Sequence, residues 1–196
     1  MLKLEVVIGS TRPGRVGLPV GRWFYELAKK HGKFKVALAD LAEIDLPFMN
    51  EAKHPRFQDY EHDHTKAWSE RIDAADAIVM VTSEYNYAPP APLINAIDYL
   101  NKEWAYKPLG FVSYGGVSGG TRAMQVMRQM AAGVRMLPIY EAVNIPFIGG
   151  LIEGEGEARR FNAPEIQAKG ADAMLDELHK LAQVVQPLYL RQPVRA

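Results

Sequence analysis

The 196-residue sequence contains no cysteine, and its acidic and basic side chains are equal in number, 23 of each. The missing cysteine excludes disulfides, thiolate nucleophiles, iron–sulfur clusters and cysteine-based zinc sites. The charge balance leaves no basic surplus for nucleic acid or an anionic membrane, and it counts against a strongly acidic electron-carrier protein. No apolar run is long enough to cross a bilayer, and no signal-peptide pattern opens the chain. We therefore expect a cytoplasmic protein.

Short apolar runs alternate along the chain with amphipathic helical patterns. Strands are expected at residues 4–8, 34–41, 77–81, 109–113 and within 139–148, and helices at 16–30, 65–74, 92–104, 120–136 and from about 162 onward. This alternation predicts a single α/β domain over residues 1–196, a three-layer sandwich with a parallel sheet and helices on both faces. Five such units usually adopt the strand order 2-1-3-4-5. Residues 153–157 contain no apolar side chain and are expected to form an exposed, flexible loop.

The first predicted strand ends in a polar, glycine-containing turn at residues 9–17. Small residues such as Gly9 and Ser10 allow backbone amides to converge at the start of the following helix, where the helix dipole favours an anion. Arg12 and Arg15 can pair with a terminal phosphate. The turn has neither the Gly-Lys-Ser/Thr of a Walker loop nor the glycine pattern of a dinucleotide site. The alternative is a polar turn with two solvated arginines.

The third predicted strand ends in a turn that is rich in aromatic residues and proline, at residues 83–90. Tyr85, Asn86 and Tyr87 are suited to an aromatic ligand that also forms hydrogen bonds, because ligands bind at this edge of open α/β sheets. The alternative is a turn that packs on its own helix. Asn95 and Asp98, in the next predicted helix, either brace that turn or face solvent.

The fourth predicted strand ends in a turn with four glycines among nine residues, 113–121. Glycines allow a backbone to approach a ligand closely. Amides here can bind the pyrimidine edge of a flavin and stabilise the negative charge that reduction places on it. Three turns of this kind on adjacent strand ends argue more strongly for a ligand than any one of them does.

Together these turns resemble the NADPH-dependent FMN reductase family, the flavodoxin-like quinone, azo-dye and metal-ion reductases. The motifs that carry the resemblance are Gly9-Ser10-x-Arg12, Glu84-Tyr85-Asn86 with Pro89, Leu93 and residues 95–98, and Gly115-Gly116 with Gly119-Gly120. Many members have Ser in place of Arg15 and Pro in place of Ser83. The resemblance implies a flavodoxin-like fold and bound FMN.

By this resemblance, the FMN phosphate would lie on the first turn, the ribityl chain and ring on the second, and the pyrimidine edge on the third. The residues expected to bind FMN are Gly9, Ser10, Arg12, Arg15, Val16, Gly17, Ser83, Glu84, Tyr85, Asn86, Tyr87, Ser113, Tyr114, Gly115 and Gly116. No side chain is expected to act as a catalytic acid or base, because the flavin carries the chemistry. Residues 59–64 contain histidines and carboxylates, but their place in a polar segment before a helix leads us to expect no metal site.

The resemblance further implies hydride transfer from NADPH or NADH to flavin N5, followed by transfer to a second substrate in the same pocket. That acceptor would be a quinone, azo compound, flavin or metal ion, and the protein would be a homodimer or homotetramer. Two alternatives stay open: a flavodoxin-like electron-carrier protein, and a flavin reductase that supplies free reduced FMN to a monooxygenase. The choice between NADPH and NADH also stays open.

Overall fold

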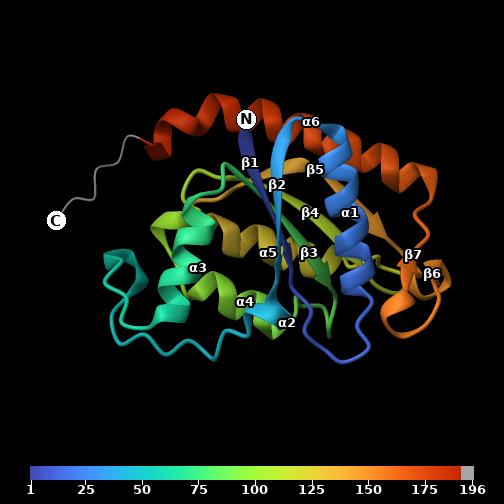
Figure 1. Ribbon diagram of the computed structural model, residues 1–196, viewed down its shortest axis with the longest axis horizontal. Coiled ribbons are helices and arrows are strands. Elements are labelled where there is room, and N and C mark those ends of the chain that lie inside the picture. Colours follow the sequence, from blue (N-terminus) through green and yellow to red (C-terminus); the bar gives the residue numbers. More distant parts are fainter. Residues whose placement is uncertain (191–196) are drawn as a thin grey trace.

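The computed structural model describes residues 1–190, so the last six residues of the predicted domain lie outside the described part of the chain. Five parallel strands form the main sheet in the order β2-β1-β3-β4-β5 (Figure 1). They are β1 (Leu2–Ile8), β2 (Phe34–Asp40), β3 (Ala77–Ser83), β4 (Pro108–Tyr114) and β5 (Leu137–Ile145). Strands β3 and β4 are buried throughout. The predicted α/β fold and its strand order are confirmed.

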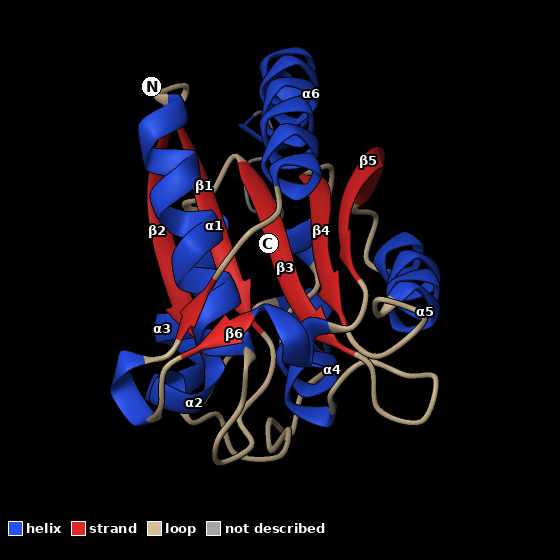
Figure 2. Ribbon diagram, turned by 90° about the vertical axis from the view of Figure 1, so that its right-hand side faces the viewer, coloured by secondary structure: helices blue, strands red, loops and turns tan. Residues whose placement is uncertain are grey.

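Helices cover both faces of this sheet and enclose two apolar clusters (Figures 1 and 2). On one face, α1 (Gly17–His31) and α6 (Glu165–Leu190) pack on residues such as Val6 and Val79. The other face is covered by α3 (Asp63–Asp73), α4 (Ala91–Asp98) and α5 (Thr121–Gly133), which contact residues such as Met80 and Phe111. A single-turn helix, α2 (Leu41–Ile44), follows β2. In the described part of the chain, no helix combines the length and apolar character needed to span a bilayer.

The helix predicted at residues 92–104 is shorter than expected and ends at Asp98. The chain turns there because Glu103 accepts the Asn101 amide at 3.2 Å, while the Trp104 indole donates to the Ile97 carbonyl at 3.1 Å. A short 3₁₀ segment, Lys102–Trp104, follows. Trp104 is thereby buried in the core.

Asn95 braces a distant segment rather than the turn that precedes its helix. Its side-chain oxygen accepts the Met49 amide at 2.9 Å, and its amide nitrogen donates to the Pro47 carbonyl at 2.7 Å. The buried Tyr99 hydroxyl donates to the same carbonyl at 3.1 Å. These bonds fasten the long connection between α2 and α3 onto α4, whereas Asp98 is exposed.

Of the residues predicted as an exposed loop, 153–157, the first ends a strand of a small antiparallel hairpin and the others lie in its connection. Its strands are β6 (Ile152–Glu153) and β7 (Arg160–Phe161). Phe161 is buried against Trp23 of α1, with ring centroids 5.0 Å apart and planes at 81°. The hairpin is therefore anchored beside the N-terminal half of α1, as Figures 1 and 2 both show.

Candidate functional site

The three turns singled out from the sequence lie together at the carboxyl edge of the sheet. Strand β3 pairs with β1 on one side and with β4 on the other, so the turns that follow these strands are neighbours. The Gly9 amide of the first turn donates to the Val81 carbonyl in β3 at 2.9 Å. Figure 2 shows the carboxyl ends of the three strands side by side. This edge is where open parallel sheets bind ligands.

The first turn leaves several backbone amides unpaired at the N-terminus of α1, where no side chain caps the helix. Among the described residues, we find no acceptor for the amides of Thr11, Arg12, Val16 and Gly17. The first turn of α1 contains no acidic residue, and no side chain caps its start. Unpaired amides and the positive end of a helix dipole form a favourable environment for a phosphate. The turn therefore fits the phosphate group of FMN.

Arg15 and Arg12 occupy different positions in this turn. The Arg15 guanidinium forms a bidentate ion pair with Asp40 at the end of β2, with both N–O distances at 2.5 Å. It also donates to the Ser10 carbonyl at 2.6 Å. Its charge is thus matched by a carboxylate whose side chain is only 4% exposed. Arg12 is exposed and has no ion-pair partner among the described residues.

Ser10 and Tyr114 connect the first and third turns through their hydroxyl groups. The buried Tyr114 hydroxyl donates to Ser10 Oγ at 3.1 Å, and burial raises the pKa of this phenol. Gly17 packs directly against the pair, because a Cβ at this position would lie 2.2 Å from Ser10 Oγ. Only glycine fits there without moving both hydroxyls.

The second turn has a strained backbone at its tip. Tyr85 and Ala88 exchange two hydrogen bonds, of 2.8 and 3.0 Å. The two residues between them, Asn86 and Tyr87, have positive φ angles of 51° and 68°. Such angles at both central positions define a type I′ turn, which is costly for a tyrosine. Strain of this kind concentrates at functional sites. Tyr87, at the tip of the turn, is 65% exposed.

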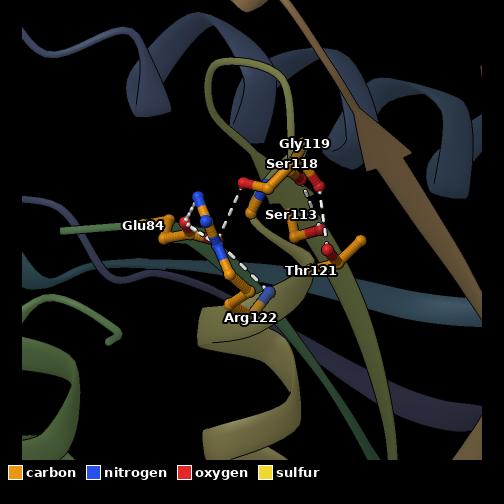
Figure 3. A network of polar contacts seen from close by, with 7 residues as sticks. Glu84, Ser113, Ser118, Gly119, Thr121 and Arg122 are labelled. Atoms are coloured by element: carbon orange, nitrogen blue, oxygen red, sulfur yellow. Dashed lines mark hydrogen bonds and ion pairs between the residues drawn. The ribbon is translucent and has the colours of Figure 1, made fainter. Parts of the chain in front are cut away.

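Glu84 ties the second turn to the third (Figure 3). Its carboxylate accepts hydrogen bonds from Ser118 Oγ at 3.0 Å, from the Arg122 amide at 3.2 Å and from Arg122 Nε at 2.6 Å. Burial opposes the charged form, but the bonds from Arg122 and Ser118 prevail and lower the pKa of Glu84. The Arg122 guanidinium also stacks on the Tyr87 ring, 3.9 Å from its centroid. The side chain of Glu84, a residue predicted to bind the ligand, is thus occupied by Ser118 and Arg122. Only its backbone is left to contact a ligand.

The third turn is fixed against the end of β5. Gly115 donates its amide to the Ile145 carbonyl at 3.2 Å, so this amide is already paired. Ser113 Oγ donates to the Gly119 carbonyl at 2.8 Å across the loop. Gly119 and Gly120 have positive φ angles of 60° and 79°, and a Cβ at Gly120 would lie 2.8 Å from the Tyr114 backbone. Among the described residues, the Gly116 amide has no acceptor and is available to a ligand.

Two further features of this edge are suited to a bound molecule. The Ser83 hydroxyl is buried at the end of β3 without a hydrogen-bond partner among the described residues. A ligand atom at this edge can satisfy such a group. A recess of about 270 Å³ opens on the β2 side of the first turn. It is lined by Thr11, Leu41, Ala42, Asp45, Leu46 and Pro92.

Three residues that hold the turns in place were not predicted from the sequence, namely Asp40, Ser118 and Arg122. Asp40 carries a weak signal, because it lies next to the end of the strand predicted at residues 34–41, at the ligand-binding edge. Ser118 and Arg122 carry none, since their partner Glu84 lies more than 30 residues earlier.

Comparison with known proteins decides the family. The family model described as NADPH-dependent FMN reductase matches residues 2–149. The chain belongs to the NADPH-dependent FMN reductase family. It is accordingly an oxidoreductase that uses FMN and a reduced nicotinamide nucleotide, as the resemblance of its turns implied.

Individual members of the reductase family are similar over most of the chain. An NAD(P)H-dependent FMN reductase of Schizosaccharomyces pombe is 38% identical over 149 residues, which is 74% of each chain. A quinone reductase of Escherichia coli is 32% identical over 163 residues, 78% of this chain and 81% of that protein. An NADPH azoreductase of a Bacillus strain is 34% identical over 159 residues, 80% of this chain and 82% of its own.

The fold of the reductase also has solved counterparts. The flavoenzyme FerB of Paracoccus denitrificans, an NAD(P)H:(acceptor) oxidoreductase, superposes with a TM-score of 0.73 at 21% identity. The superposition covers 94% of this chain and 99% of FerB. At this level of identity the similarity establishes the fold, including the continuation of the chain beyond the family match.

Proposed function

We propose that this family member uses NAD(P)H to reduce quinones or similar small acceptors, and that FMN is held by the three turns. The observation that carries the proposal is the first turn, where unpaired amides converge on the uncapped start of α1 next to Arg12. The names of the relatives, which include a quinone reductase and an azoreductase, support this class of acceptor. The overall reaction moves a hydride from the nicotinamide and a proton from solvent onto the quinone, giving the hydroquinone.

In the proposed site, Ser10, Arg12 and the amides at the start of α1 bind the phosphate. The backbone of residues 84–87 and the Gly116 amide face the ribityl chain and ring. When bound, FMN supplies the hydride-accepting ring and passes the electrons on. The protein positions that ring and excludes water from one face, and we assign no side chain as acid or base. We further propose that nicotinamide and acceptor use the open face in turn.

We assign Arg15 a supporting role, although the resemblance implied that it binds the phosphate directly. Its guanidinium is already occupied by Asp40 and by the Ser10 carbonyl. Since Asp40 also accepts the Ala42 amide at the start of α2, the pair joins the first turn to the end of β2. Arg15 therefore maintains the shape of the phosphate turn, and Arg12 supplies its charge.

We also propose that the protein is a homo-oligomer. Large apolar side chains at this edge are exposed in the single chain, among them Tyr87, Val117 and Phe147 at 65–77%. A neighbouring subunit would cover them and narrow the mouth of the pocket. Light scattering after size exclusion tests this assignment, and a monomer at micromolar concentration would contradict it.

The decisive experiment is an absorbance spectrum of protein purified with added FMN, followed by anaerobic titration with NADPH and then NADH. Direct bleaching of the flavin bands is expected, with parallel lines in double-reciprocal plots when a quinone is the acceptor. Protein that holds FMN but oxidises neither nucleotide would favour an electron carrier. Weak FMN affinity, with activity that saturates only at high added FMN, would favour a supplier of free reduced flavin. Failure to bind FMN would overturn the proposal.

A further inference from the structure

The β6–β7 hairpin lies outside the residues matched by the family model, yet it contacts the predicted phosphate turn. The model match ends at residue 149, whereas the hairpin strands begin at Ile152. Arg159, just before β7, donates from Nη1 to the Gly14 carbonyl at 2.6 Å. Gly14 lies in the first turn, between the two arginines of its phosphate motif, with a φ angle of 70°. A segment without any family motif thus touches the centre of the candidate anion site.

The direction of the Arg159 side chain follows from the extended backbone at β7. In a strand, alternate side chains point to the same face, so Arg159 and Phe161 share one face and Arg160 takes the other. Phe161 fixes the inward face by packing on Trp23 of α1. Arg159 is accordingly directed at the turn that precedes α1, while Arg160 is exposed. Gly154 permits this hairpin, since a Cβ there would lie 2.7 Å from the Ala158 carbonyl.

The chemistry of Arg159 is suited to an anion. A guanidinium has five N–H donors, and the contact with Gly14 uses one nitrogen. The Gly14 carbonyl carries no formal charge, and among the side chains that the structure describes Arg159 has no ion-pair partner, in contrast to Arg15, which pairs with Asp40. Arg159 is half-buried rather than fully extended into solvent. Its remaining donors and its charge lie next to a turn that already presents unpaired amides.

We propose that Arg159 belongs to the FMN phosphate site. It braces the first turn through the Gly14 carbonyl and adds positive charge beside Arg12, so that the hairpin contributes to flavin affinity. This inference rests on the proposed function, because it assigns a further residue to the same FMN site.

The test compares FMN with riboflavin, which lacks the phosphate, by fluorescence titration of wild type, Arg159→Ala and Arg160→Ala. We expect Arg159→Ala to weaken FMN binding roughly tenfold, close to the lower end of the range for hydrogen bonds to charged groups. Riboflavin affinity should be unchanged, and Arg160→Ala, which removes the same charge one residue along, should bind both flavins as wild type does. A loss that is equal for both flavins, or equal in both variants, would overturn the inference.

A second variant separates the two contributions and protects the test against misfolding of the first. Arg159→Gln keeps an amide donor on a shorter side chain but no charge. Weaker FMN binding in both variants assigns the effect to the charged guanidinium, and weaker binding in Arg159→Ala alone shows that a neutral donor at this position is sufficient. Wild-type FMN affinity in Arg159→Gln and Arg159→Ala refutes the inference. Wild-type protein that fails to bind FMN would instead refute the proposed function.

Discussion

Glu84 and Arg122 join the turns that follow β3 and β4. The carboxylate of Glu84 accepts from both the backbone amide and the side chain of Arg122, and this side chain in turn lies against the Tyr87 ring. One ion pair therefore sets the spacing between the turn expected to face the flavin ring and the turn expected to face its pyrimidine edge. Its partners are 38 residues apart in the sequence.

Glu84→Gln is expected to lower the melting temperature by about 2–4 °C, the shift that losing a single modest interaction produces in a chain of this size. FMN affinity should fall as well, because the two turns lose their common anchor.

Folding lowers the pKa of Glu84, so its stabilising effect is present above its unfolded pKa and is lost as pH falls through the folded value. Thermal melts between pH 3 and 7 check this.

Glu26→Gln is the matched control for Glu84→Gln. Glu26 forms a surface ion pair with Lys29 three residues along α1, and its side chain is 65% exposed. Such pairs contribute little to stability. Equal melting temperatures for the two variants would contradict the role assigned to Glu84.

Arg12→Ala should weaken FMN binding by about 1.5–3 kcal/mol, the range for hydrogen bonds to charged groups. Riboflavin binding should not change, because the lost partner is the phosphate. Isothermal titration with each flavin measures the difference. Arg22→Ala, which removes an exposed arginine of α1, should leave both affinities as they are. Unchanged FMN affinity in Arg12→Ala would remove this residue from the site.

Arg15→Ser should destabilise the protein by about 3 kcal/mol, because it leaves Asp40 buried without its partner. The double variant Arg15→Ser/Asp40→Asn should recover part of this loss, since no uncompensated charge remains. Urea unfolding of both single variants and of the double variant gives the coupling energy. Additive effects of the two substitutions would show that the pair does not act as a unit.

Lys107 makes stability rise with pH in the alkaline range. It is 1% exposed, and burial lowers its pKa to about 8. The unfolded lysine holds its proton to higher pH, so above pH 8 the unfolded state binds more protons than the folded one. Unfolding free energy should then increase with pH, by up to about 3 kcal/mol on complete deprotonation of the folded state.

Urea unfolding between pH 7 and 10 of wild type, Lys107→Met and Lys35→Met isolates this contribution. The rise in unfolding free energy with pH should be absent in Lys107→Met and persist in Lys35→Met, because Lys35 is exposed on β2. The same pH dependence in all three proteins would show that other groups are responsible.

The alternation of apolar runs and helical patterns was sufficient to predict the sheet, its strand order and the edge at which ligand-type turns meet. It did not predict which side chains hold those turns. Ser10 and Tyr114 are 104 residues apart, and Arg15 and Asp40 are 25 apart, so only the folded chain shows these contacts. Local patterns also failed at Asp98, where the helix ends because Glu103 and Trp104 form tertiary hydrogen bonds.

The position of Lys107 has a practical consequence. Its ammonium group donates to the Asp73 carbonyl at 2.8 Å at the end of α3, just before β4 begins at Pro108. The turns proposed to bind FMN lie at the far end of the same seven-residue strand, about 23 Å away by the rise of an extended chain. Substitutions around Lys107 are therefore expected to change the stability of the protein in alkaline media from a position remote from the proposed FMN site, which makes this end of the sheet a suitable starting point for engineering.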